Sequence, residues 1–311
     1  MSKKKLQSHG IPEGFIIRLA DIFGQSLFSQ VEKTFIERLT SFRVNTIKAT
    51  REEVMQTLRD ANVSTQQIPW YKDAFILKNK SKRELMELPI YTDGKIYIQS
   101  LASMVPPLVL DPKPGETVLD LTAAPGSKTS EMAAFMGKEG RLIANDNNKV
   151  RFFKLKHNLE LLGVLDESGF LKLRLEDGSR LCGEYGEYFD KILVDAPCSA
   201  EARFIAGDPK TYGYWSERKI KEMAYKQRKL LFSAWYALKS GGTLVYSTCT
   251  FAPEENEKQV ERFLSRFPNA ETLPVELSGL KMLSTSVPYA MRLLPTSDVE
   301  GFFIAKIRKH A

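Results

Sequence analysis

The stretch TVLDLTAAPGSKT, residues 117–129, joins a short apolar segment to a helical pattern through a loop of small residues. The segment TVLDL has the character of a buried strand, and residues 127–136 fit a helix. Small residues in the loop let the backbone approach a ligand, and Gly126 permits a tight turn. A strand, a turn and a helix in this order predict the first unit of a doubly wound α/β sheet, with a ligand site at the turn.

Similar units follow along the chain. Apolar segments at 141–146, 170–175, 191–197 and 241–248 alternate with helical patterns at 149–162, 216–238 and 254–267, and a last strand is expected at 301–308. Residues 97–110 are expected to form a strand that leads into a helix. Near-continuous apolar strands that alternate with helices predict a parallel, doubly wound sheet for residues 94–311.

Residues 1–93 have a different pattern. Amphipathic helices are expected at 12–23 and 28–39, followed by FRVNT at 42–46, a helix at 51–60 and strand-like segments at 64–70 and 74–78. This mixture predicts a small α+β module. Its basic run KNKSKR, residues 78–83, is equally compatible with a solvated loop and with RNA contact.

Composition limits the class of protein. A chain of 311 residues that is 43% hydrophobic can form one large and one smaller domain. A net charge of +7 and a pI of about 9.1 suit a polyanionic partner such as RNA or DNA, although an ordinary basic protein remains an alternative. The basic N-terminus is not followed by an apolar run, and no stretch approaches a transmembrane span. We therefore expect no signal peptide, no membrane partner and a cytoplasmic location.

The sequence has three cysteines, Cys182, Cys198 and Cys249, and three widely separated histidines. An odd number of cysteines without a C-x-x-C pair argues against a disulfide framework or a zinc site. We therefore expect reduced thiols and no metal, and we interpret Cys182 as a small buried apolar residue.

Three interpretations compete for the loop after the first strand. A dinucleotide fingerprint fails because only one glycine is present. A P-loop fails because Ser127 separates Gly126 from Lys128 and Leu121 stands at the first glycine position. S-adenosylmethionine has no phosphate and needs only a close backbone turn, so the loop favours this cofactor.

Acidic residues end the next two strands. Asp146 can accept hydrogen bonds from both ribose hydroxyls, as acids at this position do in related nucleotide-binding sheets. Asp177, in the segment EDG at 176–178, can accept from an adenine amino group. A lone aspartate is more often a turn or helix cap. The occurrence of both at successive strand ends favours the ligand interpretation.

The fourth and fifth strands end in DAPCS, residues 195–199, and YSTCT, residues 246–250. These positions place Asp195, Cys198 and Cys249 over one cleft. Carbon 5 of cytosine is a poor nucleophile, but a thiolate that adds to carbon 6 turns the ring into an enamine that can attack a methyl donor. An acid near ring nitrogen 3 favours that addition. The pattern therefore suits methylation of cytosine.

LDLTAAPGSKT, VDAPCS and YSTCTFAPEENE resemble the signature segments of the Nol/Nop/Sun family of RNA (cytosine-5-)methyltransferases. FRVNT and GFFIAKIRK are also similar to family features, and the resemblance runs from about residue 40 to the C-terminus. It implies a Rossmann-like S-adenosylmethionine-dependent methyltransferase sheet (residues 94–311) preceded by a small α+β RNA-binding module (residues 1–93). The bacterial ribosomal-RNA members look most similar, so rRNA is favoured as substrate, tRNA remains possible, and we expect a monomer.

The resemblance also implies roles for individual residues. Cys249 matches the nucleophile, and Cys198 matches the cysteine thought to assist release. Asp195 matches a contact to both cofactor and base, and Lys128 a residue that holds the base or Asp195. The remaining cofactor positions match Thr122, Ala123, Ala124, Pro125, Gly126, Ser127, Lys128, Asp146, Arg151 and Asp177.

One departure concerns the P-C-S loop, where the family usually continues with glycine and a basic stretch. Ala200 stands there instead, and it puts the shape of the loop in question. Bacterial rRNA members often carry a C-terminal RNA-binding extension, which we expect to be absent because the sequence ends at Ala311. Two other functions are less compatible with the sequence than RNA methylation. An RNA-binding or ribosome-assembly factor with a decayed site is disfavoured by the intact cysteines, and a DNA enzyme is disfavoured by the T-C cysteine. Removal of the residues before Gly94 is expected to weaken RNA binding and to spare cofactor binding.

Overall fold

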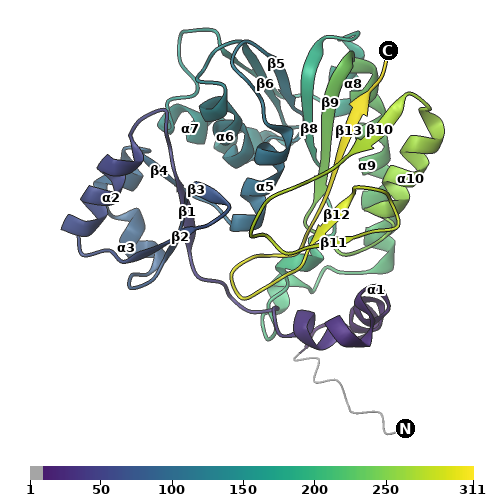
Figure 1. Cartoon of the computed structure of the whole chain (residues 1–311), viewed down its shortest axis with the longest axis horizontal. Coiled ribbons are helices and arrows are strands. Elements are labelled where there is room, and N and C mark those ends of the chain that lie inside the picture. Colours follow the sequence, from purple (N-terminus) through teal and green to yellow (C-terminus); the bar gives the residue numbers. More distant parts are fainter. Residues whose placement is uncertain (1–9) are drawn as a thin grey trace, which may run out of the picture.

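A computed structural model describes residues 10–311 (Figure 1). The basic stretch at residues 1–9, on which the expectation of no signal peptide rests, lies outside the described residues. The chain forms two sheets, a four-stranded sheet near the N-terminus and, within the described residues, a nine-stranded sheet in the remainder.

The smaller sheet has the antiparallel order β2-β3-β1-β4. Its elements are β1 (Ser41–Val44), α2 (Arg51–Asp60), β2 (Thr65–Ile68), β3 (Tyr71–Leu77), α3 (Lys82–Met86), α4 (Pro89–Thr92) and β4 (Ile96–Ile98). A capping box between Thr50 and Glu53 fixes the start of α2, and α2 buries Val54 and Leu58 against the sheet. The strand expected after Gly94 is β4, which pairs with β1, so the small sheet extends past residue 93.

The larger sheet has the order β11-β12-β13-β9-β8-β5-β6-β7, with β10 beside β13. Five strands are parallel: β5 (Thr117–Asp120), β6 (Arg141–Asn145), β7 (Leu171–Arg174), β8 (Phe189–Asp195) and β9 (Leu238–Thr248). The order reverses between β5 and β8, which is where such sheets bind ligands. The predicted Rossmann-like sheet is confirmed.

The other edge of this sheet is antiparallel, which differs from the fully parallel sheet expected. The strand β13 (Phe302–Lys309) runs antiparallel to β9. Three short antiparallel strands extend this edge: β10 (Ala270–Leu273) and β12 (Met291–Leu293) pair with β13, and β11 (Met282–Ser284) pairs with β12. The short strands were not predicted because each has only three or four residues, too few for a periodic pattern.

Helices cover both faces of the large sheet. The first face carries α5 (Leu101–Leu110), α6 (Ser127–Phe135) and α7 (Lys149–Leu161), and the second carries α8 (Gly178–Gly183), α9 (Glu217–Ala237) and α10 (Glu257–Arg266). Successive side chains of β5 alternate, so Val118 packs in the first core and Leu119 in the second. The helix expected at 254–267 begins only at Glu257, because residues 253–256 form turns.

The N-terminal helix α1 (Glu13–Glu32) lies apart from the small sheet and against the larger domain (Figure 1). It is kinked at Gly24, where φ is 65°, a value that glycine adopts readily. The second helix expected at 28–39 is present but misplaced, because it follows the kink at Gly24 and ends at Glu32, where the chain turns inward to bury Phe35. The rings of Phe15 and Phe35 lie 5.5 Å apart, and both belong to a cluster with Phe251.

Candidate active site

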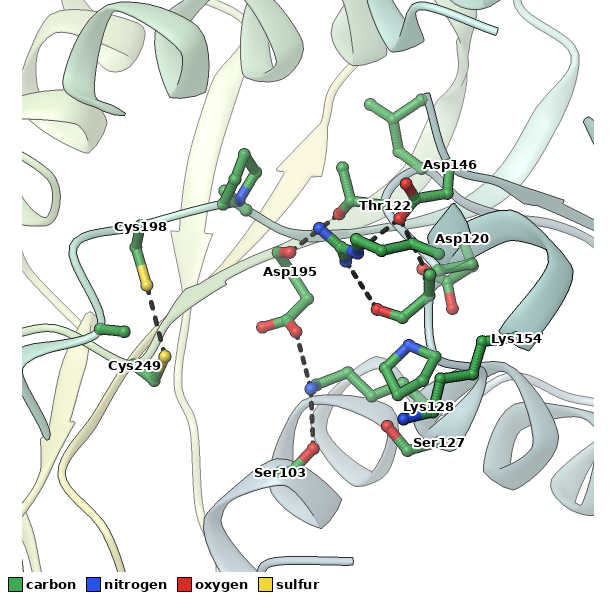
Figure 2. Close-up of a pocket in the computed structure, with 18 of the residues that line it drawn as sticks. Ser103, Asp120, Thr122, Ser127, Lys128, Asp146, Lys154, Asp195, Cys198 and Cys249 are labelled. Carbon is green, nitrogen blue, oxygen red and sulfur yellow. Dashed lines mark hydrogen bonds and ion pairs between the residues drawn. The ribbon is translucent and has the colours of Figure 1, made fainter. Parts of the chain in front are cut away.

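A cavity of about 760 Å³ opens at the carboxyl ends of the parallel strands. Figure 2 shows that it runs from Asp146, past Asp195, to Cys198 and Cys249. This volume lies within the roughly 300–1,000 Å³ typical of small-molecule sites. The segment between β4 and α5 forms another wall through Gln99 and adjacent residues, a contribution that the sequence pattern did not reveal.

The loop after β5 is held on both sides. Thr122 Oγ1 donates to the backbone oxygen of Asp195 at 2.8 Å, and the Ala123 amide donates to the oxygen of Asn145 at 2.7 Å. Gly126 has φ of 103°, and a Cβ there would lie 3.1 Å from Leu155 Cδ1. Its role is therefore to let the loop turn tightly against α7. The expected loop residues Thr122, Ala123, Ala124, Pro125, Ser127 and Lys128 face the cavity.

Asp146 is buried at the end of β6 and faces the cavity. Its Oδ1 accepts from the Asn148 amide at 3.0 Å, and its Oδ2 accepts from the Ala124 amide at 3.3 Å. Arg151 Nη2 lies 3.1 Å from Asp146 Oδ2 and donates to the oxygen of Ala124 at 2.7 Å. Arg151 therefore connects the acid to the loop, which gives a structural basis for its expected place in the site.

Asp177 is the N-cap of α8. Its Oδ1 accepts from the amides of Ser179 and Arg180 at 2.9 and 3.2 Å, as the capping alternative describes. The adjacent Gly178 faces the cavity. Both capping bonds use one oxygen, so a contact from Oδ2 to an adenine amino group stays a prediction.

The buried Lys128 and the partly exposed Asp195 form an ion pair in the middle of the cavity (Figure 2). Lys128 Nζ lies 2.7 Å from Asp195 Oδ2 and donates to Ser103 Oγ at 2.8 Å. Ser247 Oγ donates to Asp195 Oδ1 at 2.9 Å. Both carboxylate oxygens are thus held by donors, which fixes the direction of the Asp195 carboxylate.

The two cysteines lie together at one end of the cavity, with Cys198 Sγ 3.3 Å from Cys249 Sγ. The hydrogen bond from Cys198, helped by the nearby charge of Arg203, lowers the pKa of the Cys249 thiol. The same contact, together with burial, raises the pKa of Cys198. The pair therefore has one thiol suited to ionise and one suited to hold a proton. Cys182 is buried elsewhere in the second core, and burial raises its pKa to about 12.

Two buried glutamates, which the sequence analysis did not single out, support the cysteine loops. Glu201 Oε2 accepts from Thr250 Oγ1 at 2.8 Å and from the Phe251 amide at 3.0 Å. Glu255 Oε2 accepts from the Ser199 amide at 3.0 Å, and burial raises the pKa of Glu255 to about 7. The sequence could have revealed these glutamates through their position a few residues after Cys198 and Cys249.

Ala200 faces the cavity with φ of 56° and ψ of 32°. This is the left-handed region, which costs a residue with a side chain roughly 1–2 kcal/mol. The alanine thus adopts a backbone conformation that glycine would adopt without strain, and the buried contacts of Glu201 and Glu255 hold the loop in place.

The FRVNT segment joins the two sheets. The wholly buried Arg43 donates from Nε to Gln99 Oε1 at 3.0 Å, and from Nη2 to Ser130 Oγ at 2.5 Å and to the oxygen of Ser127 at 3.3 Å. Asn45 Nδ2 donates to the oxygens of Gly94 and Leu162 at 2.7 and 2.9 Å. Because Ser127 belongs to the cofactor loop, these contacts argue against the expectation that removing the first region spares cofactor binding.

Between residues 10 and 311, no three histidine, cysteine or acidic side chains are grouped as metal ligands. No helix in this part of the chain combines the length and apolar character needed to cross a membrane.

Comparison with known proteins identifies the family. Residues 107–308 match the family described as 16S rRNA methyltransferase RsmB/F. The chain belongs to this family. Residues 11–101 match the N-terminal domain of 16S rRNA methyltransferase RsmF. The RsmB/F assignment confirms the resemblance stated from the motifs, and the chain is an S-adenosylmethionine-dependent RNA methyltransferase.

Individual relatives of this RsmB/F family member differ in their substrates. It is 39% identical over 283 residues to tRNA (cytosine(49)-C(5))-methyltransferase of Pyrococcus abyssi, which covers 86% of this chain and 88% of the relative. It is 33% identical to ribosomal RNA small subunit methyltransferase F of Pectobacterium atrosepticum, over 98% of this chain but only 64% of the relative. A methyltransferase homologue from Pyrococcus horikoshii superposes with a TM-score of 0.82 at 34% identity, covering 97% of this chain and 96% of that one.

Proposed function

We propose that this RsmB/F family member methylates carbon 5 of a cytosine in ribosomal RNA, with Cys249 as the nucleophile. The observation that carries this proposal is the pair of thiols 3.3 Å apart at the end of a cavity that also contains the cofactor loop and Asp146. Acyl or phosphoryl transfer would require neither a second cysteine nor this juxtaposition.

The residues of the cavity fit S-adenosylmethionine. Asp120, at the end of β5, is buried with its Oδ1 free of any hydrogen-bond partner among residues 10–311. Buried polar atoms are rarely left unpaired, so this oxygen suits a ligand donor. Asp146 supplies acceptors for the ribose hydroxyls, and Asp177 supplies one for the adenine amino group. Arg151 holds Asp146, and the loop from Thr122 to Lys128 lies along the ligand. When bound, the cofactor supplies an electrophilic methyl group.

The chemistry follows from the thiols. The Cys249 thiolate adds to carbon 6 of the base, which makes carbon 5 nucleophilic, and carbon 5 then takes the methyl group. Asp195, held by Lys128 at 2.7 Å, accepts a hydrogen bond from the base on the nitrogen 3 side once that nitrogen is protonated. A solvent base then takes the carbon 5 proton, and the electron pair of that bond expels the Cys249 thiolate from carbon 6 and restores the ring. Cys198, whose thiol keeps its proton, assists this release.

RNA binding involves exposed basic residues around the cavity. The target cytosine must leave its stack, because the thiol approaches one face of the ring and the methyl group arrives from the cofactor side. In α9, Arg218, Lys221 and Lys229 are exposed on the helix face opposite the buried Ile220 and Met223, and the exposed Lys226 pairs with Glu222. The KNKSKR run is exposed but partly neutralised, since Lys80 pairs with Glu84 and Arg83 with Glu87. We propose that the α9 cations contribute most of the phosphate contacts.

Ribosomal RNA is favoured because both parts of the chain match 16S rRNA methyltransferases. The tRNA alternative is supported by the archaeal tRNA enzyme, of which the match covers 88%. The chain spans less than two thirds of the length of the matched relative in Pectobacterium atrosepticum. We further propose that the protein acts as a cytoplasmic monomer.

The test combines methylation in vitro with mapping in cells. Purified protein is incubated with a labelled methyl donor and with small ribosomal subunits, free 16S rRNA or tRNA transcripts. Bisulfite sequencing of total RNA from cells with and without the gene then locates the cytosine. We expect one rRNA cytosine to lose protection in the deletion strain, with restoration by wild type and by Cys182→Ala but not by Cys249→Ala. Efficient labelling of tRNA alone would show that the substrate is tRNA and not rRNA. Labelling by Cys249→Ala would overturn the mechanism.

A further inference from the structure

A short 3-10 turn, η1 (Glu201–Arg203), is fastened directly to the loop that carries Cys249. The Ala202 amide donates to the backbone oxygen of Cys249 at 3.1 Å, and Glu201 Oε2 accepts from the Phe251 amide at 3.0 Å. Ala202 is itself buried. The backbone of Arg203 is therefore fixed relative to the nucleophile, and its side chain faces the same cavity as both cysteines.

Two carboxylates, those of Asp195 and Glu300, disfavour ionisation of the Cys249 thiol, and each lies near a cation. Asp195 is paired with Lys128 at 2.7 Å. Glu300, which precedes β13, lies with Oε2 4.0 Å from Arg203 Nε, and Ser100 Oγ donates to the same Oε2 at 3.2 Å. Glu300 faces the cavity. Arg38 also interacts with Glu300, but of these two cations it is Arg203 that faces the cavity together with Cys249.

We propose that Arg203 is a positioning residue for the reaction, which keeps the Cys249 thiolate stable and neutralises Glu300 beside it. This inference rests on the proposed role of Cys249 as nucleophile. It adds that the positive charge of Arg203 favours the thiolate form of Cys249.

Charge and geometry both support this role. A guanidinium stays protonated throughout the working pH range, so its field does not depend on pH. Both cysteines, Glu300 and Asp195 raise the pKa of Arg203, and Arg203 in turn lowers that of Cys249. The other groups that interact with Cys249 are the Cys198 thiol, which donates to it, the carboxylates of Asp195 and Glu300, which oppose its ionisation, and the Tyr214 hydroxyl. Among these groups, Arg203 supplies the positive charge.

The test titrates the thiol without RNA or cofactor. Full-length protein is treated with iodoacetamide between pH 5 and pH 10, and peptide mass spectrometry measures the alkylation rate at Cys249 separately from the other two cysteines. Wild type is compared with Arg203→Met, Arg203→Lys, Glu300→Gln and the double variant Arg203→Met with Glu300→Gln. Arg59→Met, an exposed change in α2, is the control. Circular dichroism melting verifies that each variant is folded.

We expect Arg203→Met to move the midpoint of Cys249 alkylation upward by about 1 pH unit, the lower end of the shift typical of losing an opposite charge, because the Arg203 side chain is half exposed and its charge is partly screened. Arg203→Lys restores most of the wild-type value, and the double variant recovers part of it because the opposing carboxylate is gone. An unchanged midpoint in folded Arg203→Met overturns the inference, including the case in which only RNA affinity falls. Failure of the proposed function would look different, because Cys249 would then titrate as expected and yet form no adduct with RNA.

Discussion

Arg43→Met tests whether the N-terminal module also supports the cofactor loop. Methionine fills much of the same space but makes none of the three hydrogen bonds that the buried guanidinium gives to Gln99, Ser130 and Ser127. Removing one partner of a buried charged network typically costs roughly 3–5 kcal/mol. Glu131 lies in this network and burial raises its pKa to about 8. Glu131 is therefore mostly neutral near pH 7, so the loss of Arg43 leaves no unpaired charge. We expect the free energy of unfolding to fall by about 3 kcal/mol.

Urea unfolding measures the change in the free energy of unfolding, and calorimetry with S-adenosylhomocysteine measures cofactor affinity. We expect roughly tenfold weaker cofactor binding, equivalent to about 1.4 kcal/mol, because Ser127 loses a contact that orients the loop. Arg59→Met is the matched control, since Arg59 lies in the same module, is exposed and donates to Gln56 in an exposed hydrogen bond. A decrease of less than 1 kcal/mol in the free energy of unfolding, with unchanged cofactor affinity, would refute the reasoning. The module would then have a role in RNA binding alone.

Three further outcomes are expected. Asp146→Ala removes the acceptors for the ribose hydroxyls, so calorimetry should show S-adenosylhomocysteine binding weaker by roughly 1.5–3 kcal/mol for each lost bond, whereas unchanged affinity would make Asp146 a structural residue only. Burial raises the pKa of Glu131 from 4.5 to about 8, so the folded protein keeps a proton that the unfolded chain has lost. The free energy of unfolding should therefore fall as pH rises through this window, and Glu131→Gln should flatten the decline in urea midpoints. Ala200→Gly relieves a positive φ and should raise the free energy of unfolding by up to ~1 kcal/mol with activity retained; a lower unfolding midpoint would mean that the alanine is not strained.

The sequence predicted the elements that have strong periodicity. The parallel strands and the helices α2, α6, α7 and α9 were found within three residues, because apolar residues repeat clearly in them. The second half of α1 was placed too far along, since its apolar pattern continues through Phe35, which is buried by a turn of the chain rather than by a helix.

The site was predictable where a motif ends a strand. Asp146, Asp195, Cys198 and Cys249 were all expected at one edge of the sheet, and the structure places them around one cavity. The residues that sequence reasoning missed act across long separations. Arg43 contacts Ser127, 84 positions away, and Glu300 joins the cavity from the start of β13. Such contacts depend on how the two sheets pack, which no local pattern specifies.

The order of events at the two cysteines is tested most directly by trapping the RNA adduct. Cys198→Ala is incubated with the methyl donor and end-labelled target RNA, denatured and resolved on a gel, beside Cys249→Ala and Cys182→Ala. If Cys249 attacks carbon 6 and Cys198 assists release, Cys198→Ala accumulates a denaturant-resistant band of enzyme joined to RNA. Cys249→Ala gives none, and Cys182→Ala turns over like wild type. An adduct in Cys249→Ala and none in Cys198→Ala would contradict this assignment of the nucleophile.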